Sequence, residues 1–148
     1  MKLAAAYWTL FVFSTMICMP TFAQEATYPL TVNVSGGKPG VGQAVLSLFS
    51  SSESYPKHPL REETRLVDGE GQTTFVLGQL RPGTYAVVVV HDEDGNGKLN
   101  RGFLGIPTEL VGFSNNAKIL FGPPSFDKTS FVLSEPLTIE VVLGKAKE

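Results

Sequence analysis

The segment Tyr85–His91 constrains the fold most, because its sequence is that of a β-strand with apolar residues on both faces. Successive side chains of a strand point to opposite faces of the sheet. The valines at positions 87–90 are therefore shared between the two faces, which end on His91 and Asp92. A strand that avoids water on both sides lies centrally in its sheet, so we predict that this segment is largely buried.

Other segments alternate apolar and polar residues with the period of two that half-buried strands show. The turn before the central strand contains Pro82 and Gly83, which reverse the chain tightly, and the Tyr85 hydroxyl is expected to bond back to upstream backbone. No segment has a helical stripe. Further strands are expected at residues 28–35, 43–49, 73–77, 131–133 and 137–143.

These features predict an all-β protein, a single antiparallel Greek-key β-sandwich of about seven strands with an immunoglobulin-like or transthyretin-like layout. An open barrel is the alternative. The length of 148 residues allows one domain of ordinary size. The serine-rich stretch Ser50–Pro59 is expected as a surface loop.

The first 23 residues have the pattern of a signal peptide. Lys2 provides a positive start, the next 17 residues are almost uncharged and apolar, and Thr21–Ala23 offers small residues for cleavage. We therefore expect a signal peptide at 1–23, a β-sandwich domain at 24–148, and a periplasmic or secreted protein. A retained membrane anchor is the alternative, although the apolar run is short for a spanning helix.

Charge and cysteine content exclude some classes of function. A net charge of −2 offers no electrostatic footprint for nucleic acid, and the basic residues form no run suited to an anionic membrane. Cleavage would remove Cys18, the only cysteine, so the mature domain must be held together by core packing alone. We expect neither nucleic-acid binding nor membrane insertion after cleavage.

The stretch "HDEDGNGKLN", residues 91–100, matches the spacing of a calcium-binding loop. Gly97 stands where such a loop turns sharply. Phe103 occupies the position at which an EF-hand has its closing glutamate, so Glu109 is the carboxylate expected to complete the shell. The predicted calcium ligands are Asp92, Asp94, Asn96, Lys98 through its carbonyl, Asn100 and Glu109.

Two other interpretations of this stretch remain open. It could be a plain Asp/Asn/Gly-rich turn that closes a hairpin, in a purely structural module without metal. A hydrolase could instead use His91 with Asp92, Asp94 and Glu109. Adjacent residues of a strand face opposite ways, however, so His91 and Asp92 cannot form an orienting pair without a bulge.

Residues 100–127 form a long stretch with few strand signals, and such stretches are usually functional. We expect Phe103, Phe113, Asn115 and Asn116, together with His91, to contact an unknown protein or carbohydrate ligand. The alternatives are a self-packed loop, or short strands at 108–111 or 117–121.

Four motifs carry a resemblance to a known family. They are His91–Leu99, Gly105–Glu109, Gly112–Asn116 and Gly122–Phe126, and in this order they resemble the exported bacterial family known as domain of unknown function 2141. The resemblance implies an exported all-β domain without an assigned activity. The turn before Tyr85 is similar to turns of transthyretin-like and collagen-adhesin-repeat sandwiches, a likeness of fold alone. We therefore predict an exported binding or structural module with a calcium loop.

Overall fold

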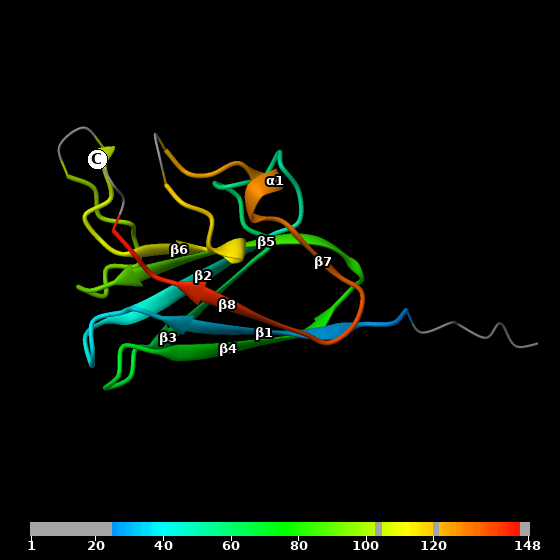
Figure 1. Cartoon of the computed structure of the whole chain (residues 1–148), viewed down its shortest axis with the longest axis horizontal. Helices are drawn as coiled ribbons and strands as arrows, with labels where there is room; N and C mark the ends of the chain where they lie inside the picture. Colours follow the sequence, from blue (N-terminus) through cyan, green and yellow to red (C-terminus); the bar gives the residue numbers. More distant parts are fainter. Residues whose placement is uncertain (1–24, 103–104, 120–121, 146–148) are drawn as a thin grey trace, which may run out of the picture.

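The computed structural model describes residues 25–102, 105–119 and 122–145, and within them the chain forms a two-layered β-structure (Figure 1). The predicted signal peptide at 1–23 lies outside the described residues. The strands are β1 (Tyr28–Ser35), β2 (Gln43–Phe49), β3 (Arg61–Leu66), β4 (Thr73–Leu80), β5 (Gly83–Asp92), β6 (Val111–Phe113), β7 (Phe131–Leu133) and β8 (Leu137–Val142), with a 3-10 helix η2 (Ser114–Asn116) and a short helix α1 (Phe126–Thr129).

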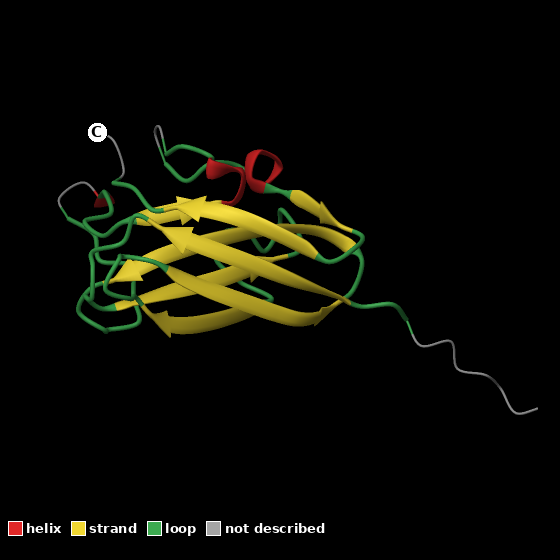
Figure 2. Ribbon diagram, turned by 60° about the horizontal axis from the view of Figure 1, so that its bottom comes forward, coloured by secondary structure: helices red, strands yellow, loops and turns green. Residues whose placement is uncertain are grey.

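The strands form two sheets that pack face to face (Figure 2). The larger sheet has the order β3-β2-β5-β6, with β7 also paired to β5, and the smaller has the order β4-β1-β8. The all-β class is confirmed, and two sheets that do not close are consistent with a sandwich. The described residues contain eight strands, so neither the count of seven nor the Greek-key order is confirmed.

One pairing corrects the prediction of a purely antiparallel fold. Strand β1 runs parallel to β8, with Leu30 opposite Leu137 and Val34 opposite Val141. Both strands start at the same end of the sandwich and run in the same direction (Figure 1). Among the described residues the pair joins the first and last strands, so no hairpin imposes an antiparallel direction on it.

The core lies between the sheets and is built from the inward face of each strand. Strand β5 occupies the central position predicted from its two apolar faces. The Tyr85 hydroxyl donates a hydrogen bond of 2.9 Å to the Arg81 carbonyl, as expected of this turn. The buried cluster contains Leu30, Val32, Val34, Ala44, Leu46, Leu48, Val67, Phe75, Leu77, Leu80, Tyr85, Val87, Val89, Leu133, Val141 and Leu143.

Strand β3 was missed by the sequence analysis because its sequence, REETRL, has no apolar alternation. It forms nevertheless, pairing antiparallel with β2 at the edge of the larger sheet. Charged side chains at an exposed edge discourage pairing with another chain. Within the described part of the chain, no helix is long and apolar enough to cross a membrane.

Strand β6 links the two sheets at one point. The backbone groups of Val111 and Gly144, which follows β8, exchange hydrogen bonds of 2.9 and 3.1 Å. Gly112 faces β8 so closely that a Cβ atom there would lie 2.6 Å from Cγ1 of Val141. Only a residue without a side chain fits between the sheets at this position.

Replacing Gly112 by alanine is therefore expected to destabilise the domain by about 1–3 kcal/mol, the range typical of overpacking. Urea unfolding of Gly112→Ala measures this. Gly78→Ala is the matched control, because Gly78 lies within β4 and a Cβ there meets nothing within 4 Å. Equal losses in the two variants would contradict the close approach at Gly112.

Candidate metal centre

The register between β5 and β6 brings Glu109 to the acidic loop. The pairs Val88–Phe113 and Val90–Val111 define this register, and continuing it places Glu109 opposite Asp92. The backbone N–H of His91 donates to the Leu110 carbonyl at 2.9 Å, which extends the pairing beyond the strand. The sequence prediction that Glu109 folds back onto the loop is consistent with this geometry.

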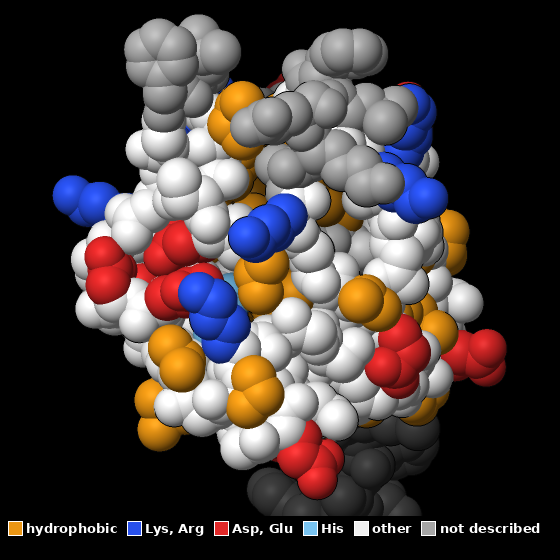
Figure 3. All heavy atoms as spheres, turned by 60° about the vertical axis from the view of Figure 1, so that its left-hand side comes forward, with side chains coloured by type: hydrophobic (Ala, Val, Ile, Leu, Met, Phe, Trp, Pro, Cys, Tyr) orange, Lys and Arg blue, Asp and Glu red, His pale blue; other side chains and the backbone are white. Residues whose placement is uncertain are grey.

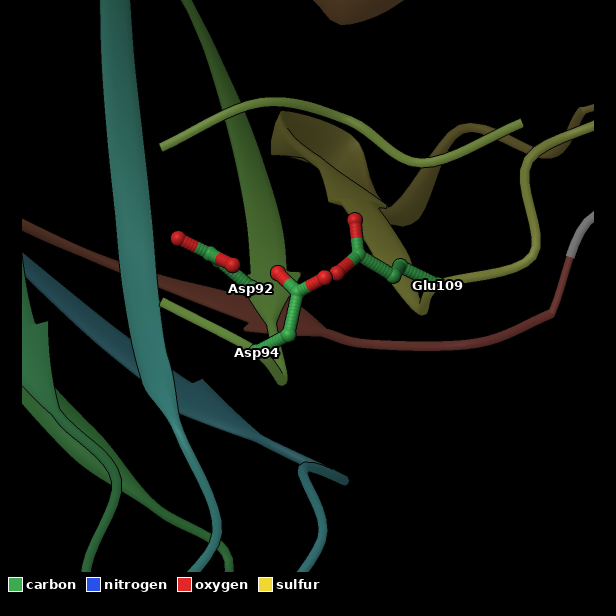
Figure 4. A group of neighbouring side chains, drawn as sticks. All are labelled: Asp92, Asp94 and Glu109. Atoms are coloured by element: carbon green, nitrogen blue, oxygen red, sulfur yellow. The ribbon is translucent and has the colours of Figure 1, made fainter. Parts of the chain in front are cut away.

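Three carboxylates consequently gather at one end of the sandwich. One oxygen from each of Asp92, Asp94 and Glu109 lies within 4.8 Å of the others, and the three side chains converge in Figure 4. Asp92 and Glu109 are buried, whereas Asp94 is exposed. Figure 3 shows acidic side chains gathered at this end of the molecule, next to basic ones.

Asp92 is held by four donors. Its Oδ1 accepts hydrogen bonds from the backbone N–H groups of Gly95 (2.9 Å) and Asn96 (3.1 Å). Its Oδ2 accepts from the Gly97 N–H (2.8 Å) and from Nε2 of Gln43 (2.9 Å). Burial alone would raise the pKa of Asp92, but these hydrogen bonds outweigh burial and lower the pKa, so the side chain is ionised at neutral pH.

The loop turns where the spacing predicted. Gly97 has φ of 71°, in the left-handed region that favours glycine. Oδ2 of Asp94 accepts hydrogen bonds of 2.9 Å from the amide nitrogens of Asn96 and Asn100. Oδ1 of Asn96 accepts from the Lys98 N–H at 2.7 Å. All five predicted ligand residues of the loop thus lie in one hydrogen-bonded turn.

Glu109 fastens the two ends of this loop. Its Oε2 accepts a hydrogen bond of 2.8 Å from the Asn100 N–H, and its Oε1 accepts one of 3.2 Å from the Glu93 N–H. A side chain from outside the loop therefore links Glu93, the second residue of the loop 92–100, to its last residue, Asn100. Because Glu109 is only 4% exposed, its charge is largely withdrawn from water.

His91 does not join the acids. Its ring is fully buried on the core face of β5, and Nε2 lies 2.8 Å from the Val41 carbonyl oxygen. Among the described residues, Nδ1 has no hydrogen-bond partner. The imidazole and the Asp92 carboxylate leave the strand on opposite faces, as the parity argument predicted, so the geometry gives the hydrolase hypothesis no acid–histidine pair.

The other predicted ligand contacts are engaged inside the chain or lie outside the described part. Phe113 is buried at 4% exposure on β6. Asn115 donates to the Ser130 carbonyl at 2.9 Å, and the side-chain oxygen of Asn116 accepts from the Val142 N–H at 2.9 Å. Phe103 lies outside the described residues. A short strand does occur in this stretch, but it is β6 at Val111–Phe113, which shares only Val111 with the range 108–111 expected from the sequence.

Two residues of structural importance escaped the sequence analysis. Gln43 holds Asp92 because it stands opposite that residue in the register of β2 and β5. Ser114 is fully buried, and its hydroxyl accepts from the Val87 N–H (2.9 Å) and donates to the Thr129 carbonyl (2.5 Å). Ser114 lies within the motif Gly112–Asn116 and Gln43 within none, but neither contact could be read from the sequence, since each depends on strand register or on tertiary packing.

Comparison with known proteins gave one match. A family model described as "Uncharacterized protein conserved in bacteria (DUF2141)" matches residues 32–140, which include the acidic loop and Glu109. No curated protein and no solved structure matches the chain.

Acidification is expected to destabilise the domain through Asp92. Because its pKa lies below the usual value of about 3.9, the ionised group contributes stability at neutral pH, and that contribution is lost as the pH falls below the usual value through the folded-state pKa. Asp92→Asn should cost about 1–3 kcal/mol near neutral pH and flatten the acid limb of the stability profile.

Urea unfolding in EGTA, from neutral to acidic pH, measures this profile without any contribution from divalent ions. Asp127→Asn, at an exposed position on α1, serves as the control and should keep the profile of the parent chain. An Asp92→Asn profile that parallels the parent's would show that Asp92 does not carry the pH dependence.

Proposed function

The chain belongs to the bacterial family DUF2141, an uncharacterised family, and from that premise we propose that it is an exported β-sandwich binding module whose residues 92–100 form a calcium loop closed by Glu109. One observation carries the proposal: oxygens of three carboxylates, one of them from outside the loop, lie within 4.8 Å of one another. Export rests on the sequence pattern of residues 1–23.

Unbalanced charge supports a cation. Like charges repel more strongly where burial excludes water. Within the described part of the chain the ion pairs are Lys38–Glu93, Arg61–Glu63 and Arg81–Glu25, and none includes Asp92, Asp94 or Glu109. A divalent cation at their meeting point would neutralise most of this charge.

Calcium suits the donor set best. It binds six to eight oxygen ligands from carboxylates, amides and backbone carbonyls in flexible geometry. Three carboxylates, two asparagine amides and the Lys98 carbonyl supply this set, while no cysteine or histidine lies among them. The N–H groups that donate hydrogen bonds to Asp92 and Glu109 would orient these carboxylates toward the ion without coordinating the ion themselves.

Calcium binding requires a small rearrangement of the loop. The amides of Asn96 and Asn100 now turn their nitrogens toward Asp94, so each would rotate to present its oxygen. Rotation of a terminal amide leaves the backbone in place. With few carboxylates in the set, we expect the weak affinity of extracellular modules, about 10⁻⁴ to 10⁻³ M.

A structural module without metal is the second candidate, and it has an observation of its own. Each Asp92 oxygen already accepts two hydrogen bonds, and Glu109 already fastens the ends of the loop. Such a turn is closed without an ion. The two candidates differ in their response to calcium.

Thermal unfolding of residues 24–148 in millimolar calcium, in magnesium and in EGTA separates them. Calcium should raise the unfolding midpoint, with a stabilisation of about 1.4 kcal/mol at ten times Kd. Asp94→Asn and Glu109→Gln should each lose most of this calcium-dependent shift, because each removes one of the three charges.

Glu135→Gln is the matched control, since Glu135 is exposed and lies in the turn between β7 and β8. It should respond to calcium as the parent chain does. Identical unfolding midpoints of the parent chain in calcium and in EGTA would contradict the calcium proposal and favour the structural module without metal.

A further inference from the structure

The acidic loop contains the dipeptide Asn96–Gly97, whose side chain and backbone can react with each other. The backbone nitrogen that follows an asparagine can attack the carbonyl carbon of the side chain, Cγ, and expel ammonia. Glycine after the asparagine favours this attack, because it has no Cβ atom to hinder the approach of its nitrogen. Both residues are exposed, so water has access to the reacting bond.

The side chain of Asn96 is held where attack on it would be assisted. Its Oδ1 accepts a hydrogen bond of 2.7 Å from the Lys98 N–H. This oxygen becomes negatively charged when a nucleophile adds to Cγ, and a backbone N–H directed at such an oxygen stabilises that charge. The Lys98 N–H is therefore in position to stabilise the tetrahedral intermediate.

The attacking nitrogen also makes a contact that assists the reaction. The Gly97 N–H donates to Oδ2 of Asp92 at 2.8 Å. A nucleophile is activated when a basic group lies within hydrogen-bond reach of its proton. The turn therefore provides both halves of the reaction, since Gly97 presents a polarised N–H and Asn96 presents a polarised carbonyl group.

We propose that Asn96 is a site of spontaneous deamidation. The Gly97 nitrogen bonds to Cγ of Asn96, the Cγ–Nδ2 bond breaks, and the proton of the Gly97 nitrogen leaves with Nδ2 as ammonia. Water then adds to one of the two carbonyl groups of the resulting cyclic imide and opens the ring to aspartate or isoaspartate. No bound ion takes part, so this proposal does not depend on calcium binding.

The product changes the interactions of the loop. Nδ2 of Asn96 donates hydrogen bonds of 2.9 Å to Oδ2 of Asp94 and to Oδ1 of Asn100. Deamidation replaces this donor by a carboxylate oxygen, which repels the Asp94 carboxylate and offers no proton to Asn100. The modified loop consequently carries one more negative charge and loses these contacts across the turn.

Peptide mapping by mass spectrometry, on residues 24–148 incubated at neutral pH in EGTA, tests the proposal. Deamidation should accumulate at Asn96 at least about tenfold faster than at any other asparagine. The product should include isoaspartate, which direct hydrolysis of the amide does not form. The other asparagines of the chain, none of which precedes glycine, are controls within the same sample: Asn33, Asn100, Asn115 and Asn116. Equal rates at Asn96 and at these asparagines, or a product without isoaspartate, would overturn the proposal.

Two alanine variants separate the reacting bond from the shape of the turn. Gly97→Ala should slow deamidation of Asn96 by about tenfold or more, because a Cβ atom hinders the attacking nitrogen. Gly95→Ala is the matched control, since Gly95 and Gly97 have φ of 73° and 71° and a Cβ atom at either meets nothing within 4 Å. The control strains the backbone in the same way but leaves the Asn96–Gly97 bond unchanged, so its rate should stay near the parent's. Equal slowing in both variants would refute the attack by the Gly97 nitrogen.

Asn96→Asp reproduces one product and tests its effect on the loop. We expect its unfolding midpoint in EGTA to lie about 3–6 °C below that of the parent, because repulsion replaces the contact with Asp94. Incubation should move the midpoint of the parent toward that of Asn96→Asp, while the midpoint of Gly97→Ala should not change with incubation. Identical midpoints of the parent and Asn96→Asp would argue against the loss of contacts across the turn.

Discussion

The antiparallel register between β5 and β6 is the constraint on which the rest of this structure depends. It is short, only three residue pairs, and the His91–Leu110 hydrogen bond extends it. At one end of the pairing, this register sets Glu109 against the acidic loop. Further along, it sets Val111 and Phe113 beside Val90 and Val88 on the outer face of the sheet. The charged centre and the apolar outer face are therefore built from the same few hydrogen bonds.

A central strand that is apolar on both faces explains the architecture around it. The inward face of β5 supplies Val87 and Val89 to the core between the sheets. The outward face, with Val88 and Val90, cannot be left to water without cost, which is about 25 cal/mol for each Å² exposed. Residues 97–99 and 105–107, in the connection between β5 and β6, line a pocket over that face together with Val88 and Val90. These are packing contacts, which do not require regular structure.

Sequence reasoning succeeded where the pattern is local. Alternation located β1, β2, β4 and β8, and the apolar residues on both faces located β5. Parity correctly placed His91 and Asp92 on opposite faces. The loop's spacing predicted which side chains would share one turn. Glu109 was reachable only as the nearest later carboxylate, because its place depends on the register of a strand that the sequence outlines weakly.

What the sequence could not reveal depends on contacts between distant segments. The edge strand β3 forms because β2 offers it hydrogen bonds, although its residues show no strand pattern. Gln43 and Ser114 look ordinary until pairing and packing bring Asp92 and Thr129 to them. The parallel direction of β1 and β8 is set by the path of the whole chain.

That parallel pair also governs the order in which the domain is assembled. Until residues 137–142 arrive, β1 has a neighbour on one side only, and the smaller sheet consists of two strands. Contacts between the ends of a chain close slowly, because the intervening loop entropy must be overcome first. A growing chain of this protein therefore keeps one edge of β1 unpaired until β8 has been made.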